Sequence, residues 1–382
     1  MPLPAGLGTI VAVRWVGNAI TRIPYVFLTA FSAGLGVPLT TMTTILGVRE
    51  LGGIASLGIG RWSDHGHERR AQVTCAFAGG ALAVLAGFTS EPLLFAALLV
   101  GCGVAVFGLL AAQTSWVAHR VPFERRARAV GITELTWGAA FFLAAPLSAW
   151  LIDLGGWQLP LRVFGAALLA GGALTFAVLP ADHRSDQSMA PPARWAEVAA
   201  AARRHAGVVA YNVLQPFAQM LVFAVAGDWF VQHLGMSLTG LGANTLLIGA
   251  GEITGTAATV LFADRVGPAR SGIAGMTVAV PCAAALGLVG ADAALGVALL
   301  VGVAIGMELS FVSAFPLLTE VAPESRAAMI GAGIALMTVS RAVAAVAAGW
   351  IYEAGGITAS GLTAAGVAVL AALALAPSAR HR

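Results

Sequence analysis

The sequence predicts an all-α membrane protein with twelve transmembrane helices in two six-helix bundles. Hydrophobic residues make up 58% of the chain and charged residues only 10%, against roughly 45–50% and about 25% in soluble domains. Apolar runs of about 20 residues, the length that crosses a bilayer, follow one another along the chain. The second half also repeats patterns of the first, as membrane proteins built from paired bundles do.

The apolar runs are separated by charge clusters and by Gly/Pro breaks. They define twelve candidate spans: 10–36, 40–60, 72–90, 93–116, 127–152, 159–180, 207–232, 239–262, 271–290, 294–318, 327–352 and 358–376. The segment from Ala181 to His205 is polar and contains the Pro191-Pro192 pair, so we expect it outside the membrane. The predicted domains are an N-terminal bundle at 1–180, a cytoplasmic linker at 181–206 and a C-terminal bundle at 207–382.

The internal repeat recurs at a nearly constant offset. Residues 97–101 match 298–302, residues 150–156 match 350–356, and the turn at Asp64 matches the turn at Asp264. Several registered matches indicate two similar halves, each about half the chain.

Arginine placement predicts the orientation. Arginines gather on the even-numbered connections between spans, whereas the odd-numbered connections carry mostly acids, with Arg162 as the exception. Because basic loops stay in the cytoplasm, we expect a multi-pass protein of the cell inner membrane with both termini and the linker in the cytoplasm.

Four loop motifs make the chain similar to the major facilitator superfamily. The turn after span 2 and its counterpart after span 8 carry Gly60, Arg61, Ser63, Asp64, Arg69 and Arg70, then Asp264, Arg265 and Gly267. The loops after spans 4 and 10 carry Pro122, Glu124, Arg125, Arg126, Ala127, Arg128 and Gly131, then Pro323, Glu324, Ser325, Arg326, Ala327 and Gly331. His65 and Gly66 depart from the family pattern. The resemblance implies the major facilitator fold and secondary active transport of a small organic solute by alternating access.

The resemblance also implies a cytoplasmic gate. Asp64 is expected against the N-terminus of helix 11, sharing Arg120 or Arg128, and the positive-inside rule alone also accounts for the arginines. The candidate gating residues are Gly60, Asp64, Arg120, Arg128, Asp264, Arg265, Glu134 and Asp228. Glu134 equally suits a position facing the cytoplasmic loops, and Asp228 suits an outer gate or rim.

Ionisable residues inside spans are costly and suggest a functional site. Six of them lie roughly 18–23 Å from the cytoplasmic ends at 1.5 Å per residue, near the middle of a layer about 30 Å thick: Arg22, Arg49, Glu50, Glu252, Glu308 and Arg341. Polar residues accompany them, among them Asn18, Gln113, Asn212 and Gln219. We predict that these residues bind substrate or couple protons, since the resemblance implies that helices 1, 4, 7 and 10 line the cavity.

Within that set, roles differ. Glu308 is the first candidate for a proton carrier and Glu252 the second, while Arg22 is predicted to bind substrate. Structural interpretations remain open: Arg49 and Glu50 could form an ion pair, Glu50 could pair with Arg341, and Arg22 could cap a helix broken near Pro24.

The predicted function is proton-coupled export of a small molecule. Pro146 in span 5 matches antiporting exporters, although Ala145 and Ala149 stand where these have Gly. The alternatives are an importer or uniporter of an organic anion, a channel, or a transport-inactive sensor. An enzyme is disfavoured because the sequence contains no phosphate-binding loop, metal-spaced His pair or nucleophile elbow.

No cofactor or metal is expected. The three cysteines, Cys75, Cys102 and Cys282, lie in apolar segments and do not form a disulfide or metal framework. The expected partners are a small-molecule substrate, protons and the lipid bilayer, with no nucleic acid, and the protein is expected to be a monomer.

Overall fold

The computed structural model describes residues 6–121, 123–182, 195–322 and 326–380, and over these it is all-helical. Side chains are described in those ranges except at 123–128, 130, 195, 260, 262–264, 314–315, 326–327 and 380. The chain forms two compact units, the first comprising Met1–Gln187 with Leu238–Leu246, and the second Ser188–Ser237 with Leu247–Arg382.

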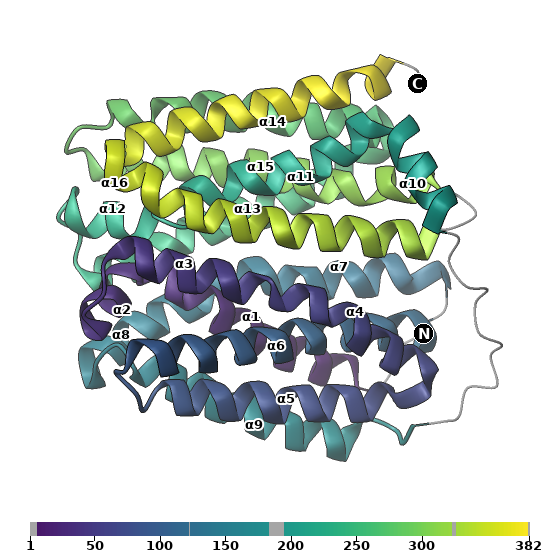
Figure 1. Ribbon diagram of the computed structural model, residues 1–382, viewed down its shortest axis with the longest axis horizontal. Helices are drawn as coiled ribbons and strands as arrows, with labels where there is room; N and C mark the ends of the chain where they lie inside the picture. Colours follow the sequence, from purple (N-terminus) through teal and green to yellow (C-terminus); the bar gives the residue numbers. More distant parts are fainter. Residues whose placement is uncertain (1–5, 122, 183–194, 323–325, 381–382) are drawn as a thin grey trace. The chain divides into compact units, whose positions relative to one another are not determined.

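The helices of the first unit run roughly along one direction (Figure 1). They are α1 (Leu7–Val26), α2 (Leu28–Leu35), α3 (Leu39–Glu50), α4 (Gly52–Trp62), the π-helix η1 (Ser63–His67), α5 (Glu68–Ala86), α6 (Pro92–Arg120), α7 (Phe123–Ala139), the π-helix η2 (Ala140–Ala144), α8 (Ala145–Gly155) and α9 (Leu159–Val178).

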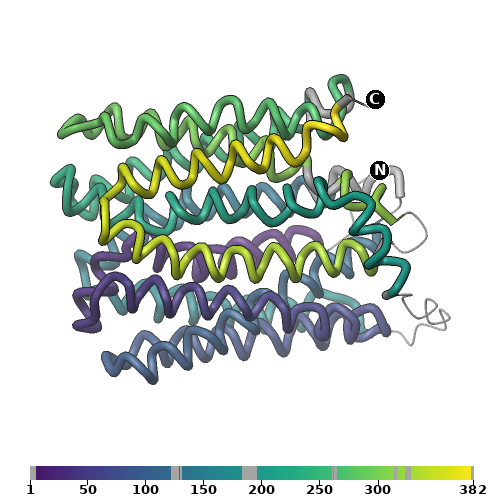
Figure 2. The backbone as a smooth tube through the Cα atoms, turned by 45° about the horizontal axis from the view of Figure 1, so that its top comes forward, coloured from purple at the N-terminus to yellow at the C-terminus, as the bar shows by residue number. Residues whose placement is uncertain are grey.

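The second unit repeats this arrangement with longer uninterrupted helices. They are α10 (Trp195–Arg204), α11 (Ala206–Phe223), α12 (Ala226–Gln232), α13 (Leu238–Val266), α14 (Pro268–Ala285), the 3₁₀-helix η3 (Leu286–Leu288), α15 (Ala293–Val321) and α16 (Arg326–Arg380). Figure 2 shows that α16 turns back on itself. The turn lies at Gly355 and Gly356, whose backbones leave the helical region.

Kinks divide several spans without ending them. One break lies at Phe27 between α1 and α2, and another lies at Leu51 between α3 and α4. The π-helix η2 directly precedes Pro146, whose ring removes a backbone donor and displaces the preceding turn. When α11 and α12 are also joined, α16 is counted as two helices at its turn and the short α10 is left out, the helices of the described residues form twelve segments. This confirms the predicted all-α fold with twelve spans.

Length and composition alone identify fewer spans. Within the described ranges, seven helices are long and apolar enough to cross a membrane, or eight if the bent pair that begins at Leu28–Leu35 counts as one span. The helix α1 is not among the seven, because the polar residues along one of its faces lower its mean hydropathy.

The internal repeat is visible in the backbone. Glycines with positive φ recur in both halves, as the pairs Gly36 and Gly235, Gly66 and Gly267, and Gly156 and Gly356. Gly66 has φ 87° and Gly267 has φ 91°, a region that favours glycine because it has no Cβ. The equivalent connections therefore make equivalent turns in both halves.

Small residues let the helices approach closely. At Gly80 on α5, an added Cβ would lie 2.8 Å from the carbonyl oxygen of Gly165 on α9. At Gly275 on α14, it would collide with the carbonyl oxygen of Gly306 on α15. Packing through small residues is how helices associate in lipid, where apolar burial alone gives no advantage.

Candidate functional site

A polar stripe runs along one face of α1 in the first unit. It consists of Arg14, Asn18, Arg22 and Tyr25, which are all buried. Residues spaced by three or four positions share a helix face, and the stripe covers about 17 Å at 1.5 Å per residue. Its partners come from α3, α6 and α7, so one helix face collects the polar groups of three neighbours.

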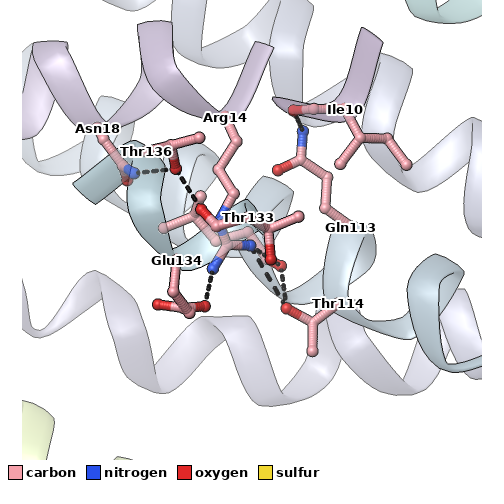
Figure 3. Close-up of polar contacts among 9 residues, drawn as sticks. Ile10, Arg14, Asn18, Gln113, Thr114, Thr133, Glu134 and Thr136 are labelled. Atoms are coloured by element: carbon pink, nitrogen blue, oxygen red, sulfur yellow. Dashed lines mark hydrogen bonds and ion pairs between the residues drawn. The ribbon is translucent and has the colours of Figure 1, made fainter. Parts of the chain in front are cut away.

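Arg14 is the most extensively bonded residue of the stripe. Its Nη2 donates to Glu134 Oε1 on α7 over 2.7 Å, while Nη1 donates to the Leu110 carbonyl over 3.3 Å and to Thr114 Oγ1 over 3.4 Å (Figure 3). The Arg14 side chain is 9% exposed and that of Glu134 is 49% exposed. Arg14 is absent from the candidates predicted from the sequence, which include Glu134 as a gating residue without a partner.

Two side-chain amides lie on either side of Arg14 (Figure 3). Asn18 Nδ2 donates to Thr136 Oγ1 over 3.0 Å, and Gln113 Nε2 lies 3.5 Å from the Ile10 carbonyl oxygen. The amide oxygens of both residues are buried and have no hydrogen-bond partner among the described residues. A buried acceptor without a donor costs free energy, so a ligand that brings a donor would be stabilised here.

Arg22 lies further along the stripe, among aromatic rings. Its Nη1 donates to the Trp137 carbonyl over 2.8 Å, and its guanidinium carbon lies 4.4 Å from the Trp137 ring centroid and 3.4 Å from that of Phe141. Aromatic faces attract a cation through their quadrupole. The structure therefore holds this arginine against the span that contains η2.

Arg49 and Glu50 form the buried ion pair that the sequence left open. Arg49 Nη2 donates to Glu50 Oε1 over 2.7 Å, and the Tyr25 hydroxyl lies 3.2 Å from the same oxygen. The guanidinium carbon of Arg49 also lies 5.1 Å from the centroid of the Tyr25 ring. Its Nε and Nη1 are buried and have no hydrogen-bond partner in the described part of the chain. The predicted pair between Glu50 and Arg341 joins the two units and stays a prediction.

The second unit has its own polar face on α11. Asn212 Nδ2 donates to the Gly333 carbonyl over 2.9 Å, and Gln215 Nε2 donates to the Met307 carbonyl over 3.0 Å. Gln219 is buried one turn further along. These amides connect α11 with α15 and α16, so this polar face is richer in amides than the stripe on α1.

The two predicted proton carriers lie on neighbouring helices of the second unit. Glu252 on α13 is 1% exposed and Glu308 on α15 is 7% exposed. Thr256 Oγ1 donates to Glu308 Oε1 over 3.4 Å, which bridges the two helices. Arg341 on α16 is half-buried. The carboxylates therefore lie within the helical packing of this unit and not on its surface.

The turn between α4 and α5 carries the residues of the expected gate, whose contact with the N-terminus of helix 11 joins the two units and stays a prediction. Asp64 is exposed, and its Oδ1 accepts from the Ser115 hydroxyl over 2.6 Å. Arg120 lies 3.4 Å from Glu68 Oε2 instead of pairing with Asp64, and His119 lies 2.6 Å from the other oxygen of the buried Glu68. Arg120 therefore lies against Glu68, at the start of α5 facing the end of α6, and an interaction of Asp64 with Arg128 stays a prediction.

A carboxylate lies at the N-terminus of α5. The backbone amides of Arg69 and Arg70, in the first turn of α5, donate to Asp182 over 2.7 and 3.3 Å. Such placement stabilises an acid through the helix dipole. Asp182, which the sequence places in the linker, thereby fastens the end of α9 to α5.

The remaining gating candidates have different outcomes. The glycine that the turn requires is Gly66 and not Gly60: Gly60 is helical, and an added Cβ would lie 3.8 Å from Ala111 Cβ, an ordinary contact. Arg265 is exposed. The side chains of Arg128 and Asp264 lie outside the described residues. Asp228 is buried and hydrogen-bonds the Tyr352 hydroxyl, and its role at an outer gate or rim stays a prediction.

Solved structures with the same fold cover almost the whole chain. A bacterial homologue of the human lysosomal transporter Spinster, in an inward-facing and occupied conformation, has a TM-score of 0.73 at 13% identity, covering 98% of this chain and 96% of that one. The nucleoside transporter NupG, solved as a point mutant, has a TM-score of 0.77 at 16% identity, covering 97% and 99%. The human organic anion transporter MFSD10 (TETRAN) has a TM-score of 0.68 at 18% identity, covering 97% and 100%.

Sequence comparison gives the family. No curated protein matches the chain. The family model described as Major Facilitator Superfamily matches residues 10–332, which is most of the chain. Together with twelve helical segments in two repeated halves, this match shows that the chain belongs to the major facilitator superfamily, the multi-pass membrane proteins that act as secondary transporters of small solutes.

Proposed function

We propose that this transporter exports a small organic solute in exchange for protons, with Glu308 as the proton carrier and Glu252 as the second candidate. The observation that supports this most is the burial of both carboxylates on the packed helices α13 and α15. Burial favours the neutral form of a carboxylic acid, and solvent or a nearby cation favours the ionised form. Alternating access changes these surroundings twice in each cycle, so a buried carboxylate takes up and releases a proton.

The direction of transport rests on the span that contains Pro146. The π-helix η2 before this proline bends the path of the helix, and Arg22 lies on the aromatic residues of the same segment. A bent helix in contact with a substrate-binding arginine would couple the binding of substrate to the opening of the transporter. The proposed setting is the cell inner membrane, with both termini in the cytoplasm and the protein acting as a monomer.

The test begins with a thermal-shift screen of metabolites and drugs in detergent, which identifies a solute. The protein is then reconstituted in liposomes, and labelled solute is followed with and without an imposed pH gradient. We expect Glu308→Gln to abolish accumulation driven by the pH gradient while sparing exchange of labelled for unlabelled solute, because exchange does not require proton release. Glu320→Gln is the matched control, since Glu320 is exposed on the same helix.

Two results would contradict the proposal. If both Glu308→Gln and Glu252→Gln still concentrate the solute against its gradient, neither carboxylate carries the proton. If the wild-type protein equilibrates the solute but never concentrates it, the protein is a uniporter or a channel. Absence of any solute flux with a bound ligand would indicate a sensor.

Import or uniport of an organic anion is the second candidate function. It is favoured by Arg49, whose Nε and Nη1 are buried with no hydrogen-bond partner among the described residues. A carboxylate or phosphate would satisfy these donors, and a guanidinium binds such groups through paired hydrogen bonds. Inward flux of a labelled carboxylate that is lost in Arg49→Lys would support this candidate over the first.

A further inference from the structure

One end of the second unit holds three titratable side chains in a row. Tyr352 on α16 is buried, and its hydroxyl hydrogen-bonds Asp228 on α12 and lies 3.2 Å from Nδ1 of His233, directly after α12. Asp228 is also buried, whereas His233 is exposed. The row therefore leads from an exposed imidazole through a buried hydroxyl to a buried carboxylate.

The direction of the hydrogen bonds follows from their chemistry. An ionised carboxylate only accepts, so the single Tyr352 hydroxyl proton is donated to Asp228. The oxygen of Tyr352 then faces His233 Nδ1 with a lone pair, and this nitrogen must carry the proton that it donates. The edge-on packing of the two rings, with centroids 6.0 Å apart and planes at 73°, holds the imidazole in place.

We propose that His233 and Tyr352 form a proton relay that delivers protons from solvent to Asp228. In the transfer step, the Nδ1 proton of the imidazolium moves to the Tyr352 oxygen as the Tyr352 hydroxyl proton moves to the Asp228 carboxylate. His233 becomes neutral, Tyr352 returns to a neutral phenol and Asp228 becomes a neutral carboxylic acid. One proton is moved, and nothing is oxidised or reduced.

The surroundings suit a relay better than direct access of water. Trp229 and Phe230, next to Asp228 on α12, are both buried and pack with ring centroids 5.2 Å apart. Two other charged groups on the adjoining elements have different surroundings. Glu353 is exposed, and Asp292 caps the first turn of α15 by accepting from the Leu295 amide. Among the described side chains of this unit, Asp228 is the third buried carboxylate beside Glu252 and Glu308.

The test needs no solute. Purified full-length protein in lipid nanodiscs is exposed to a rapid drop in pH, and the infrared carbonyl stretch of protonated carboxylic acids is followed in time. The component that disappears in Asp228→Asn belongs to Asp228. We expect Tyr352→Phe, which keeps the ring, to slow the growth of that component by about tenfold or more while its final amplitude is retained.

The controls separate a relay from a packing effect. His233→Gln, at an exposed position, should slow the same component without lowering the melting temperature. Tyr211→Phe removes the hydroxyl of another buried tyrosine of this unit, which hydrogen-bonds Ser310, and should leave the rate unchanged.

Equal rates in the wild type, Tyr352→Phe and His233→Gln would overturn the relay, and so would an infrared spectrum that Asp228→Asn leaves unchanged. Because proton uptake by Asp228 is measured directly, this result stands apart from whether Glu308 couples transport.

Discussion

Arg14 and Glu134 join α1 to α7 through an ion pair of 2.7 Å that is buried on the arginine side and half-exposed on the glutamate side. The pair lies beside Asn18 and Gln113, whose amide oxygens have no hydrogen-bond partner among the described residues. The ion pair thus holds α1 against α7 next to two amide oxygens that can accept hydrogen bonds. This arrangement combines rigidity with unsatisfied hydrogen-bonding capacity, as expected of a binding site.

We predict that the Arg14–Glu134 pair contributes about 1 kcal/mol to stability, the upper part of the range for exposed pairs, because only one partner is buried. A double-mutant cycle with Arg14→Gln and Glu134→Gln, followed by unfolding in detergent, measures this coupling. Arg14→Gln should cost more than Glu134→Gln, since it also removes the bonds to Leu110 and Thr114. A coupling energy near zero would show that the two side chains act independently.

The turn glycines are predicted to have opposite effects when substituted. Gly66→Ala forces an L-residue to positive φ and should lower the free energy of unfolding by about 1–2 kcal/mol. Gly60→Ala lies within a helix with room for a methyl group, and should be neutral or stabilising by about 0.5–1 kcal/mol. Thermal melting of both variants in detergent checks the ranking. A greater loss of stability in Gly60→Ala than in Gly66→Ala would show that the turn requires Gly60, as the family motif suggests.

Asp64→Asn is predicted to lower transport while leaving folding largely intact. The carboxylate is exposed and accepts from Ser115, and an amide can still accept this bond, so the change removes charge more than packing. Labelling of a cysteine introduced at the exposed Arg61 reports closure of this end, with Ser115→Ala as the matched variant that removes the donor. Wild-type transport together with unchanged labelling in Asp64→Asn would exclude a gating role.

Arg22→Ala is predicted to weaken substrate binding by about tenfold, or ~1.4 kcal/mol, with a smaller effect on the turnover rate. Arg22→Lys should recover only part of the affinity, because a lysine ammonium does not stack flat on Trp137 and Phe141 as a guanidinium does. Binding is measured by titrating the solute found in the thermal-shift screen. Equal affinity in all three proteins would make Arg22 a structural residue.

The sequence predicted the fold because the signals for it are local. Apolar length, loop charge and repeated turns each depend on neighbours along the chain. The partner of Arg120 depends instead on how α5 and α6 face each other, and nothing in the spacing distinguishes Glu68 from Asp64 as that partner. Residue spacing along the sequence therefore does not predict which side chains of distant segments form ion pairs.

Arg14 was not predicted for a different reason. It lies only four residues into the predicted span 10–36, close to an end of that span, where a positive charge is ordinary. The helical period does indicate it, because Arg14 precedes Asn18 by four residues and Arg22 by eight. Residues with this spacing share one helix face, so the stripe follows from periodicity and not from depth in the membrane.

The positive-φ glycines give the two halves the same turns in spite of different polar chemistry. Gly66 and Gly267 make equivalent turns, whereas the polar faces differ, with arginines and carboxylates in the first unit and amides with buried glutamates in the second. No residue other than glycine adopts this backbone cheaply, while the polar faces carry no such backbone constraint. The two halves thus share their bends and differ in the groups that they can bind.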